Sequence, residues 1–228
     1  NDDNRLKELN GSERTIWTDN AQAGYWKPKA KFDGDLGRIY GVQWRDWKSV
    51  DHSQPTYEGL HATKNVDQLR NLVDGMRKDP FGRRHLVTAW NPGELEVMCL
   101  PPCHVMFQAF VRPNDQGTAL PHVVDLRVDM RSVDLFLGLP FDIASYALLQ
   151  ERLAKERDYE SGWLTFHLGD AHVYKNHVTQ VHTVLARAEM PPPTLILDDR
   201  ASLFSFHPDQ ARLVDYVSHP AVPAPLNI

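Results

Sequence analysis

The segment 122–157, HVVDLRVDMRSVDLFLGLPFDIASYALLQERLAKER, changes its hydrophobic period in the middle, and this change decides the fold class. From Val124 to Met130 every second residue is apolar and the residues between are charged, which is typical of a strand with one buried face. A helix is expected to start just after Pro140 and to run to about Arg157. A strand with one apolar face that leads into a helix predicts a sheet backed by helices.

The other expected elements are shorter and are separated by polar segments. In the helix just described, Tyr146, Leu149 and Leu153 would form the buried stripe. Another helix is expected from about Val66 until Asp79-Pro80 ends it, and strands are expected at roughly 85–90, 104–112, 163–168 and 193–197. The segments 20–36 and 48–64 show no clean period and are expected to be irregular. The predicted class is α+β, in a single domain that spans residues 1–228.

Composition and charge narrow the class of protein. Hydrophobic residues make up 42% and charged residues 24% of the chain, which is ordinary for a soluble globular protein. The formal net charge of -5, with no block of Lys or Arg, argues against binding to the nucleic-acid backbone. No apolar run is long enough to cross a bilayer, so no membrane partner is expected. Cys99 and Cys103, separated by Leu100-Pro101-Pro102, are expected to be free thiols in a cytoplasmic setting, the host cytoplasm if the protein is viral.

Cys103 is the candidate nucleophile. It lies just before an expected strand and beside His104, and a neighbouring cation favours the reactive thiolate. A buried thiol that acts as a small apolar side chain is the commoner role of a cysteine, and the local sequence leaves that interpretation open. A zinc site made of Cys99, Cys103 and His104 would lack the usual second pair of ligands, so no metal is expected.

Three polar pairs are candidates for binding a phosphate or a sugar. The pair Arg83-Arg84 follows a turn, and Arg131-Ser132 offers a guanidinium and a hydroxyl at the end of a strand. His172 and Tyr174 are two residues apart and would lie on the same side of an extended chain, where both could bind a sugar hydroxyl. Each pair also has an ordinary alternative, either a solvated surface pair or a core His and Tyr, and the local patterns do not decide.

A series of stretches, taken in chain order, resembles the thymidylate synthase family over nearly the whole chain. They are Thr15–Trp17, Gly34–Arg45, Asp79–Arg84, Ala89–Leu95, Leu100–His104, Arg131–Tyr146, Gly169–Tyr174 and Ser218–Ala221. The resemblance implies a large mixed sheet backed by helices and a homodimer joined through that sheet. It also implies a transferase of nucleotide biosynthesis that acts on a pyrimidine nucleoside monophosphate. Its co-substrate would be 5,10-methylenetetrahydrofolate, without a metal.

The same resemblance implies roles for individual residues. Cys103 would attack C6 of the base, Tyr40 would support proton transfer at C5, and His104 would lie in the polar network opposite the base. The nucleotide would be bound through its phosphate, sugar and base by Arg131, Ser132, His172, Tyr174 and Asp134, with Arg83 and Arg84 reaching in from the other subunit. The folate would be contacted by Trp17, Asp134, Leu137, Gly138 and Phe141.

Asp142 departs from the family pattern, which has Asn at this position. An amide matches N3–H and O4 of uracil, whereas a carboxylate accepts from the C4 amino group of cytosine, with a proton shared between it and N3. Asp142 also falls in the first turn of the expected helix, where the helix dipole favours a negative charge and would keep the carboxylate ionised. The chain therefore resembles the deoxycytidylate hydroxymethylase branch of the family, and C5-hydroxymethylation of dCMP is the predicted reaction, with Asp142 among its catalytic residues.

Other functions stay open at this stage. A CMP hydroxymethylase, a dCMP C5-methylase and a thymidylate synthase acting on dUMP share the same chemistry. An inactive nucleotide-binding protein is the alternative from a different class. Met130 stands where the family usually has Gln, and the segment that the family has before position 1, which supplies a phosphate-binding arginine and a proton-relaying glutamate, does not stand in residues 1–228. We expect a longer parent protein.

Overall fold

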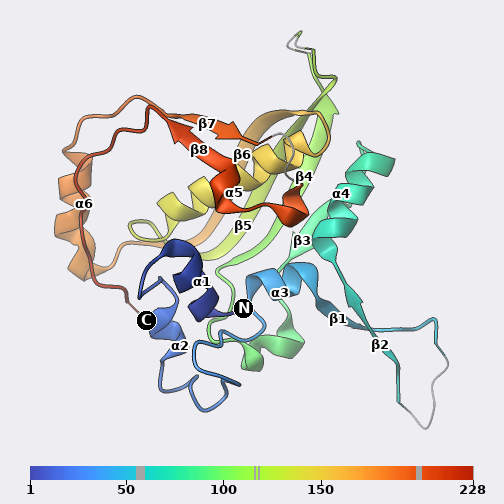
Figure 1. The fold of residues 1–228 in the computed structure, drawn as a ribbon, viewed down its shortest axis with the longest axis horizontal. Helices are drawn as coiled ribbons and strands as arrows, with labels where there is room; N and C mark the ends of the chain where they lie inside the picture. The colour runs from blue at the N-terminus through green and yellow to red at the C-terminus, as the bar shows by residue number, and fades with distance from the viewer. Residues whose placement is uncertain (55–59, 116, 118, 199–201, 228) are drawn as a thin grey trace.

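A four-stranded mixed sheet forms the centre of the computed structural model, which describes residues 1–54, 60–115, 117, 119–198 and 202–227 (Figure 1). Its strands, in spatial order, are β3 (Leu86–Thr88), β4 (His104–Pro113), β5 (His122–Asp134) and β6 (Glu160–His172). The first two pairings are antiparallel, and β5 and β6 are parallel. The crossover between the parallel strands is the helix α5 (Leu139–Lys155). The predicted α+β class, with a mixed sheet backed by helices, is confirmed.

The main core lies between this sheet and the helices α4 (Gln68–Lys78) and α5. The apolar side of β5, from Val124 to Met130, is buried as its alternation predicted. From α5, Tyr146 and Leu153 are buried, whereas Leu149 is only partly buried. These side chains form one contiguous cluster with the apolar face of α4, so the two helices and the sheet share one core.

A second, smaller core underlies the N-terminal part of the chain. It contains Trp26, Leu36, Ile39 and the buried thiol of Cys99, with Trp17 and Tyr40 packed against it. The short helices α1 (Asp3–Asn10), α2 (Thr18–Ala21) and α3 (Tyr40–Arg45) surround this core, together with the 3₁₀ helix η1 (Pro92–Val97). The segment 20–36 was expected to be irregular, and it consists mostly of turns after the end of α2.

The segment 48–64 is where the prediction of irregular structure was wrong. It contains most of a hairpin, β1 (Trp47–Val50) paired antiparallel with β2 (Thr63–Val66), which projects from the body (Figure 1). Both strands are largely exposed, so they carry no buried face whose alternation the sequence could display. Residues 55–59 of this segment lie outside the described residues.

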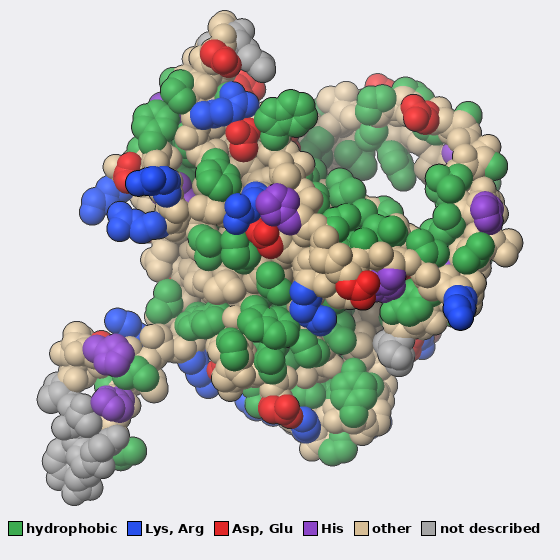
Figure 2. Space-filling view, turned by 180° about the vertical axis from the view of Figure 1, so that it is seen from behind, with side chains coloured by type: hydrophobic (Ala, Val, Ile, Leu, Met, Phe, Trp, Pro, Cys, Tyr) green, Lys and Arg blue, Asp and Glu red, His purple; other side chains and the backbone are tan. Residues whose placement is uncertain are grey.

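The C-terminal part forms an arm and a second small sheet. After η2 (Lys175–His177), the helix α6 (Val178–Leu185) stands away from the body, and the space-filling view shows an opening through the molecule beside it (Figure 2). The predicted strand at 193–197 is confirmed as β7 (Thr194–Leu197), which pairs with β8 (Ala211–Val214). Along the chain, the 3₁₀ helices η3 (Leu203–Ser205) and η4 (Pro208–Gln210) come after β7 and before β8. Within the described ranges, no helix is both long and apolar enough to span a membrane.

At Gly169 the backbone of β5 comes close to that of β6. A Cβ added at Gly169 would lie 2.7 Å from the carbonyl oxygen of Arg131 and 2.9 Å from that of Met130. We predict that Gly169→Ala lowers the free energy of unfolding by roughly 1–3 kcal/mol, because the backbone of one strand must move. Denaturant titration measures the change. The control Gly24→Ala adds a methyl group with no atom within 4 Å, and an equal loss in both variants would contradict the prediction.

Candidate active site

Arg131 holds the loop that carries Cys103. Its Nε donates to the carbonyl oxygen of Pro102 at 2.8 Å, and its Nη2 donates to that of Pro101 at 3.0 Å. Its backbone N–H donates to the carbonyl oxygen of Cys103 at 2.8 Å, and its guanidinium lies over the ring of Trp90, 5.5 Å from the ring centroid. The thiol-bearing loop is therefore tied to β5 at the end of the central sheet.

The two cysteines are free, as predicted, but their thiols differ in reactivity. Burial raises the pKa of Cys103, whereas the positive charge of Arg131 and a hydrogen bond from the Tyr40 hydroxyl lower it and the charge of Asp142 raises it further. The resting form of Cys103 is therefore the thiol, and its thiolate depends on Arg131 and Tyr40. Cys99 is 1% exposed, and burial raises its pKa to about 12, so it is inert at neutral pH.

The prediction that the imidazole of His104 would supply a cation beside the thiol is wrong. Burial lowers the pKa of His104 to about 4, so the ring is neutral at physiological pH. Its Nδ1 lies 2.7 Å from the hydroxyl oxygen of Tyr146, and its ring stacks on that of Tyr40 with centroids 4.2 Å apart. The cation that acts on Cys103 is Arg131.

Asp142 faces the same cluster from the first turn of α5. Its Oδ1 lies 3.8 Å from Nε2 of His104. The expectation that the helix dipole keeps this carboxylate ionised is wrong in direction, because burial raises the pKa of Asp142 to about 6. The carboxyl therefore binds and releases a proton close to neutral pH, which suits a group that shares a proton with a base.

Tyr40 lies between the thiol loop and the imidazole. Its hydroxyl accepts a hydrogen bond from the backbone N–H of Cys103 at 2.8 Å, and burial raises the pKa of Tyr40 well above its usual value, so the phenol stays protonated. Tyr40 has a φ of 23°, a value that few residues other than glycine adopt. A strained residue persists only where the surroundings hold it in place.

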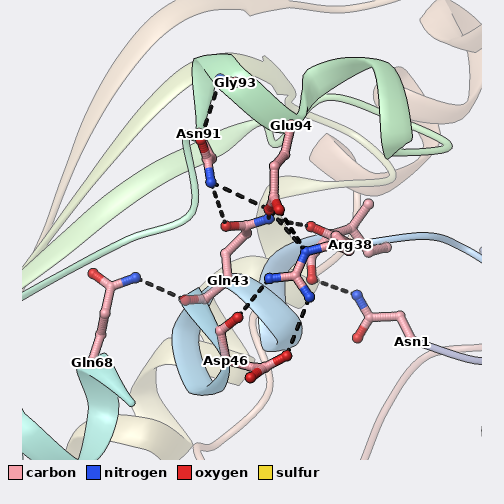
Figure 3. A network of polar contacts seen from close by, with 9 residues as sticks. Asn1, Arg38, Gln43, Asp46, Gln68, Asn91, Gly93 and Glu94 are labelled. Atoms are coloured by element: carbon pink, nitrogen blue, oxygen red, sulfur yellow. Dashed lines mark hydrogen bonds and ion pairs between the residues drawn. The ribbon is translucent and has the colours of Figure 1, made fainter. Parts of the chain in front are cut away.

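A polar network supports the helix that Tyr40 begins (Figure 3). Arg38 donates from Nε to both carboxylate oxygens of Glu94 at 2.9 Å and also pairs with Asp46 at the other end of α3. Gln43, which is fully buried, donates to Glu94 at 2.7 Å and accepts from Asn91 at 3.2 Å. These contacts tie α3 to the chain just before the thiol loop, so they fix Tyr40 relative to Cys103.

The parallel pairing of β5 and β6 brings the predicted phosphate and sugar ligands together. Ser132 pairs with Asp170, and Asp134 pairs with His172, at the same end of the sheet as Arg131. The rings of His172 and Tyr174 meet edge to face, with centroids 5.0 Å apart. Both side chains are half-buried, so they keep an accessible surface at this end of the sheet.

Arg83 and Arg84 do not lie beside the Cys103 of their own chain. Both are exposed in the turn before β3, and the carbonyl oxygen of Arg83 accepts from the side chain of Gln108 at 3.1 Å. Gln108 is five residues along β4 from Cys103, a separation of about 16 Å at ~3.3 Å per residue. The backbone of this pair therefore lies well away from its own chain's thiol.

Of the predicted folate contacts, Asp134, Leu137, Gly138 and Phe141 lie at the start of α5 or in the turn before it. Oδ1 of Asp134 accepts from the backbone N–H of Phe136 and Leu137, at 2.9 and 3.1 Å, and so shapes the turn before the helix. A Cβ at Gly138 would lie 2.9 Å from the carbonyl oxygen of Asp134, so this turn itself needs a glycine. Phe141 is 67% exposed in the first turn of α5. Trp17 lies beside Tyr40, with ring centroids 5.8 Å apart.

Tyr146 and Trp90 are the site residues whose contacts the sequence did not reveal. Tyr146 was expected only as a buried residue, but its hydroxyl binds His104. A signal was present, because Asp142 and Tyr146 are four residues apart on one helix and therefore share a face. For Trp90 no local pattern indicates that it lies beneath Arg131.

Among the described residues, no group of three or more His, Cys, Asp or Glu could hold a metal ion.

The role of Arg131 can be tested by alkylating Cys103 with iodoacetamide across a pH range. We predict that Arg131→Ala slows alkylation near pH 8 by roughly three- to tenfold, because loss of the positive charge raises the pKa of Cys103 and shifts its titration to higher pH. Arg131→Lys keeps the charge and should lie closer to wild type. Arg127→Ala, on the same strand, is the matched control, and mass spectrometry separates Cys103 from the inert Cys99. An unchanged profile in Arg131→Ala would refute the role.

Comparison with known proteins agrees with this geometry. The family model described as Thymidylate synthase matches residues 1–228. A curated relative, the thymidylate synthase of Staphylococcus haemolyticus (strain JCSC1435), is 43% identical over 199 residues, which cover 87% of this chain and 57% of the relative. The chain thus spans a little more than half the length of that relative. The ordered motifs, the fold and these matches together show that the chain belongs to the thymidylate synthase family.

Proposed function

We propose that this protein adds a hydroxymethyl group to C5 of a cytidine monophosphate, with dCMP favoured over CMP. The observation that carries this proposal is the half-buried carboxyl of Asp142, which faces His104 at the position where the family pattern has Asn. The cluster around Cys103 supports the chemistry of the family, in which a thiolate activates a pyrimidine. Because the chain spans only part of its curated relative, the activity of the whole protein is proposed as well.

The proposed reaction begins at Cys103. Its thiolate forms a bond to C6 of the base, and the electron pair of the C5–C6 double bond becomes available for C5 to attack a one-carbon electrophile. Loss of the C5 proton then breaks the bond between the one-carbon unit and the folate nitrogen, which leaves a methylene group on C5. Water adds to this methylene group, and the thiolate leaves C6 as the C5–C6 double bond forms again. Arg131 stabilises the thiolate at both ends of this sequence, and the Tyr40 hydroxyl supports proton transfer at C5.

The residues at the start of α5 fit a folate as co-substrate. 5,10-Methylenetetrahydrofolate, when bound, supplies a one-carbon unit at the oxidation level of formaldehyde. The exposed ring of Phe141, together with Leu137 and Trp17, offers apolar and aromatic surface for a pterin close to Asp142 and Tyr40. The hydroxymethyl product needs only water in addition, so no reductant is consumed and tetrahydrofolate is released.

Asp142 supports cytosine as the base. A protonated carboxyl donates to N3 of cytosine and accepts from its C4 amino group, so one side chain satisfies both positions. A proton at N3 also stabilises the negative charge that develops when the thiolate adds to C6. With its pKa raised to about 6 by burial, Asp142 carries that proton part of the time before the nucleotide binds.

A thymidylate synthase that acts on dUMP is the second candidate function. It is favoured by the name of the curated relative, which is 43% identical to this chain. A protonated carboxyl that presents its two oxygens in the opposite sense accepts from N3–H and donates to O4 of uracil. The methyl product of that reaction also requires a hydride from the folate.

We further propose that the active protein is a homodimer joined through the outer face of the sheet. Large apolar side chains are exposed there: Trp163 on β6 is 75% exposed, and Leu86 on β3 and Phe110 on β4 are exposed as well. The side of the molecule shown in Figure 2 carries apolar side chains interspersed with charged ones and histidines. A second copy on this face would bring its Arg83-Arg84 pair, too distant within one chain, toward the phosphate site.

Isotope release tests the proposed function directly. The purified protein is incubated with methylenetetrahydrofolate and dCMP, CMP or dUMP labelled with tritium at C5, and the product mass is then measured. We expect release from dCMP and a product heavier by a hydroxymethyl group. Release from dUMP alone would refute the cytosine assignment, and a product heavier by a methyl group would refute hydroxymethylation. Cys103→Ser should release no tritium.

The variant Asp142→Asn tests how the base is read. We expect its preference, measured as the ratio of kcat/KM for dCMP to that for dUMP, to shift toward dUMP by about 100-fold or more, because the amide has no acidic proton to transfer to N3 of cytosine but can accept from N3–H and donate to O4 of uracil. Glu151→Gln removes a carboxylate from an exposed position of the same helix and should leave the ratio unchanged. Equal ratios in Asp142→Asn and wild type would show that Asp142 does not read the base and serves only as a negative charge at the start of the helix.

A mixing experiment tests the shared site of the dimer. We predict that Cys103→Ala and the double variant Arg83→Ala/Arg84→Ala each lose activity, and that mixing them under conditions that exchange subunits restores part of it. One of the two sites in the mixed dimer then holds an intact thiol and an intact arginine pair. Cys103→Ala mixed with itself is the control, and no recovery in a verified mixed dimer would place both arginines outside the site.

A further inference from the structure

Tyr146 makes a contact for which its place in the core gives no reason. Its side chain is 3% exposed, and its hydroxyl oxygen lies 2.7 Å from Nδ1 of His104. The ring packs edge to face against Phe107 and Phe166, and a phenylalanine would make the same ring contacts. The hydroxyl is therefore the only part of Tyr146 that needs a separate explanation.

The direction of this hydrogen bond follows from the other groups around the hydroxyl. In the parts of the chain that the structure describes, His104 is the only hydrogen-bond partner of the Tyr146 hydroxyl. If Nδ1 carried the proton, the hydroxyl would accept, and its own hydrogen would be buried without an acceptor. If the hydroxyl donates to an unprotonated Nδ1, both groups are satisfied. Burial raises the pKa of Tyr146, and the negative charge of Asp142 raises it further. The phenol therefore stays protonated and can donate.

A hydrogen bond received at Nδ1 decides where the proton of the neutral imidazole lies. The proton then occupies Nε2, and Nε2 is the atom that faces Oδ1 of Asp142, at 3.8 Å. This separation is longer than a direct hydrogen bond. The positive end of the N–H dipole still favours an unprotonated oxygen at the facing position by electrostatic attraction. Oδ1 is then the acceptor oxygen of the carboxyl, and an acidic proton on Asp142 belongs on Oδ2.

We propose that Tyr146 is a positioning residue, which fixes the tautomer of His104 so that the Nε2–H of His104 faces Asp142 and decides which of its oxygens donates to the base. This role rests on the proposed function, because it concerns the carboxyl that would read cytosine. Tyr146 itself touches no substrate. It acts through His104, which the stacked ring of Tyr40 holds from the other side.

The tautomer can be read without any activity. In ¹⁵N-labelled wild-type protein, the histidine ring signals of His104, identified by their loss in His104→Gln, should show a protonated Nε2 and an unprotonated Nδ1. In Tyr146→Phe, a population with protonated Nδ1 should appear. The matched control is Tyr159→Phe, which removes another buried phenol hydroxyl from the same core, 3.5 Å from the carbonyl oxygen of Met76. An unchanged tautomer in Tyr146→Phe would overturn the proposal.

Turnover supplies the second measurement. We expect kcat for the preferred nucleotide to fall about tenfold in Tyr146→Phe, with KM changed less, and to be unaffected in Tyr159→Phe. Thermal unfolding of the two variants, compared with wild type, separates this effect from loss of fold. A changed tautomer with unchanged kcat would overturn the positioning role. A wild-type protein that released tritium from no nucleotide would contradict the proposed function, while the ring signals would still support or refute the tautomer assignment.

Discussion

The contact of Arg131 with the carbonyl oxygens of Pro101 and Pro102 is the constraint on which the rest of the site depends. Prolines cannot enter the strand ladder as donors, so their loop would have few backbone restraints without a side chain to bind it. One guanidinium restrains the loop and also places a positive charge near the thiol. Because Arg has five N–H donors and uses two on these carbonyls, donors remain for a phosphate, the role proposed for Arg131 within the family.

Burial acts in opposite directions on the two groups opposite this charge, and the combination sets the character of the site. Burial disfavours the charged form of each group. It therefore lowers the pKa of His104 and raises the pKa of Asp142. An ion pair between them would require both to be charged in a poorly solvated place. The cluster therefore holds one permanent charge, on Arg131, beside a neutral imidazole and a carboxyl whose pKa is about 6.

The sequence predicted the elements whose buried face is regular and the residues that a motif fixes. The alternation of β5 and the apolar stripe of α4 correspond to real faces of one core. The hairpin of β1 and β2 has no buried face, so no period could reveal it. The protonation states could not be predicted either: adjacency of Cys103 and His104 suggested a cation, but charge depends on burial, which arises only when distant elements pack. The positions of Arg83 and Arg84 show the same limit, because their distance from the thiol follows from the register of β3 on β4.

Asp142 alone is an incomplete account of base selection. A protonated carboxyl presents one donor and one acceptor, and turning it over exchanges them, so it can match the cytosine edge or the uracil edge. Selection then requires something that prevents the exchange. The structure offers one such group, since a neutral His104 with its proton on Nε2 distinguishes Oδ1 from Oδ2, and Tyr146 controls that proton from within the core. An Asn side chain needs no such group, because its oxygen always accepts and its nitrogen always donates. If Asp142 selects cytosine, the choice therefore belongs to the chain Tyr146–His104–Asp142, and the departure from the family pattern at Asp142 takes effect through residues that the pattern shares.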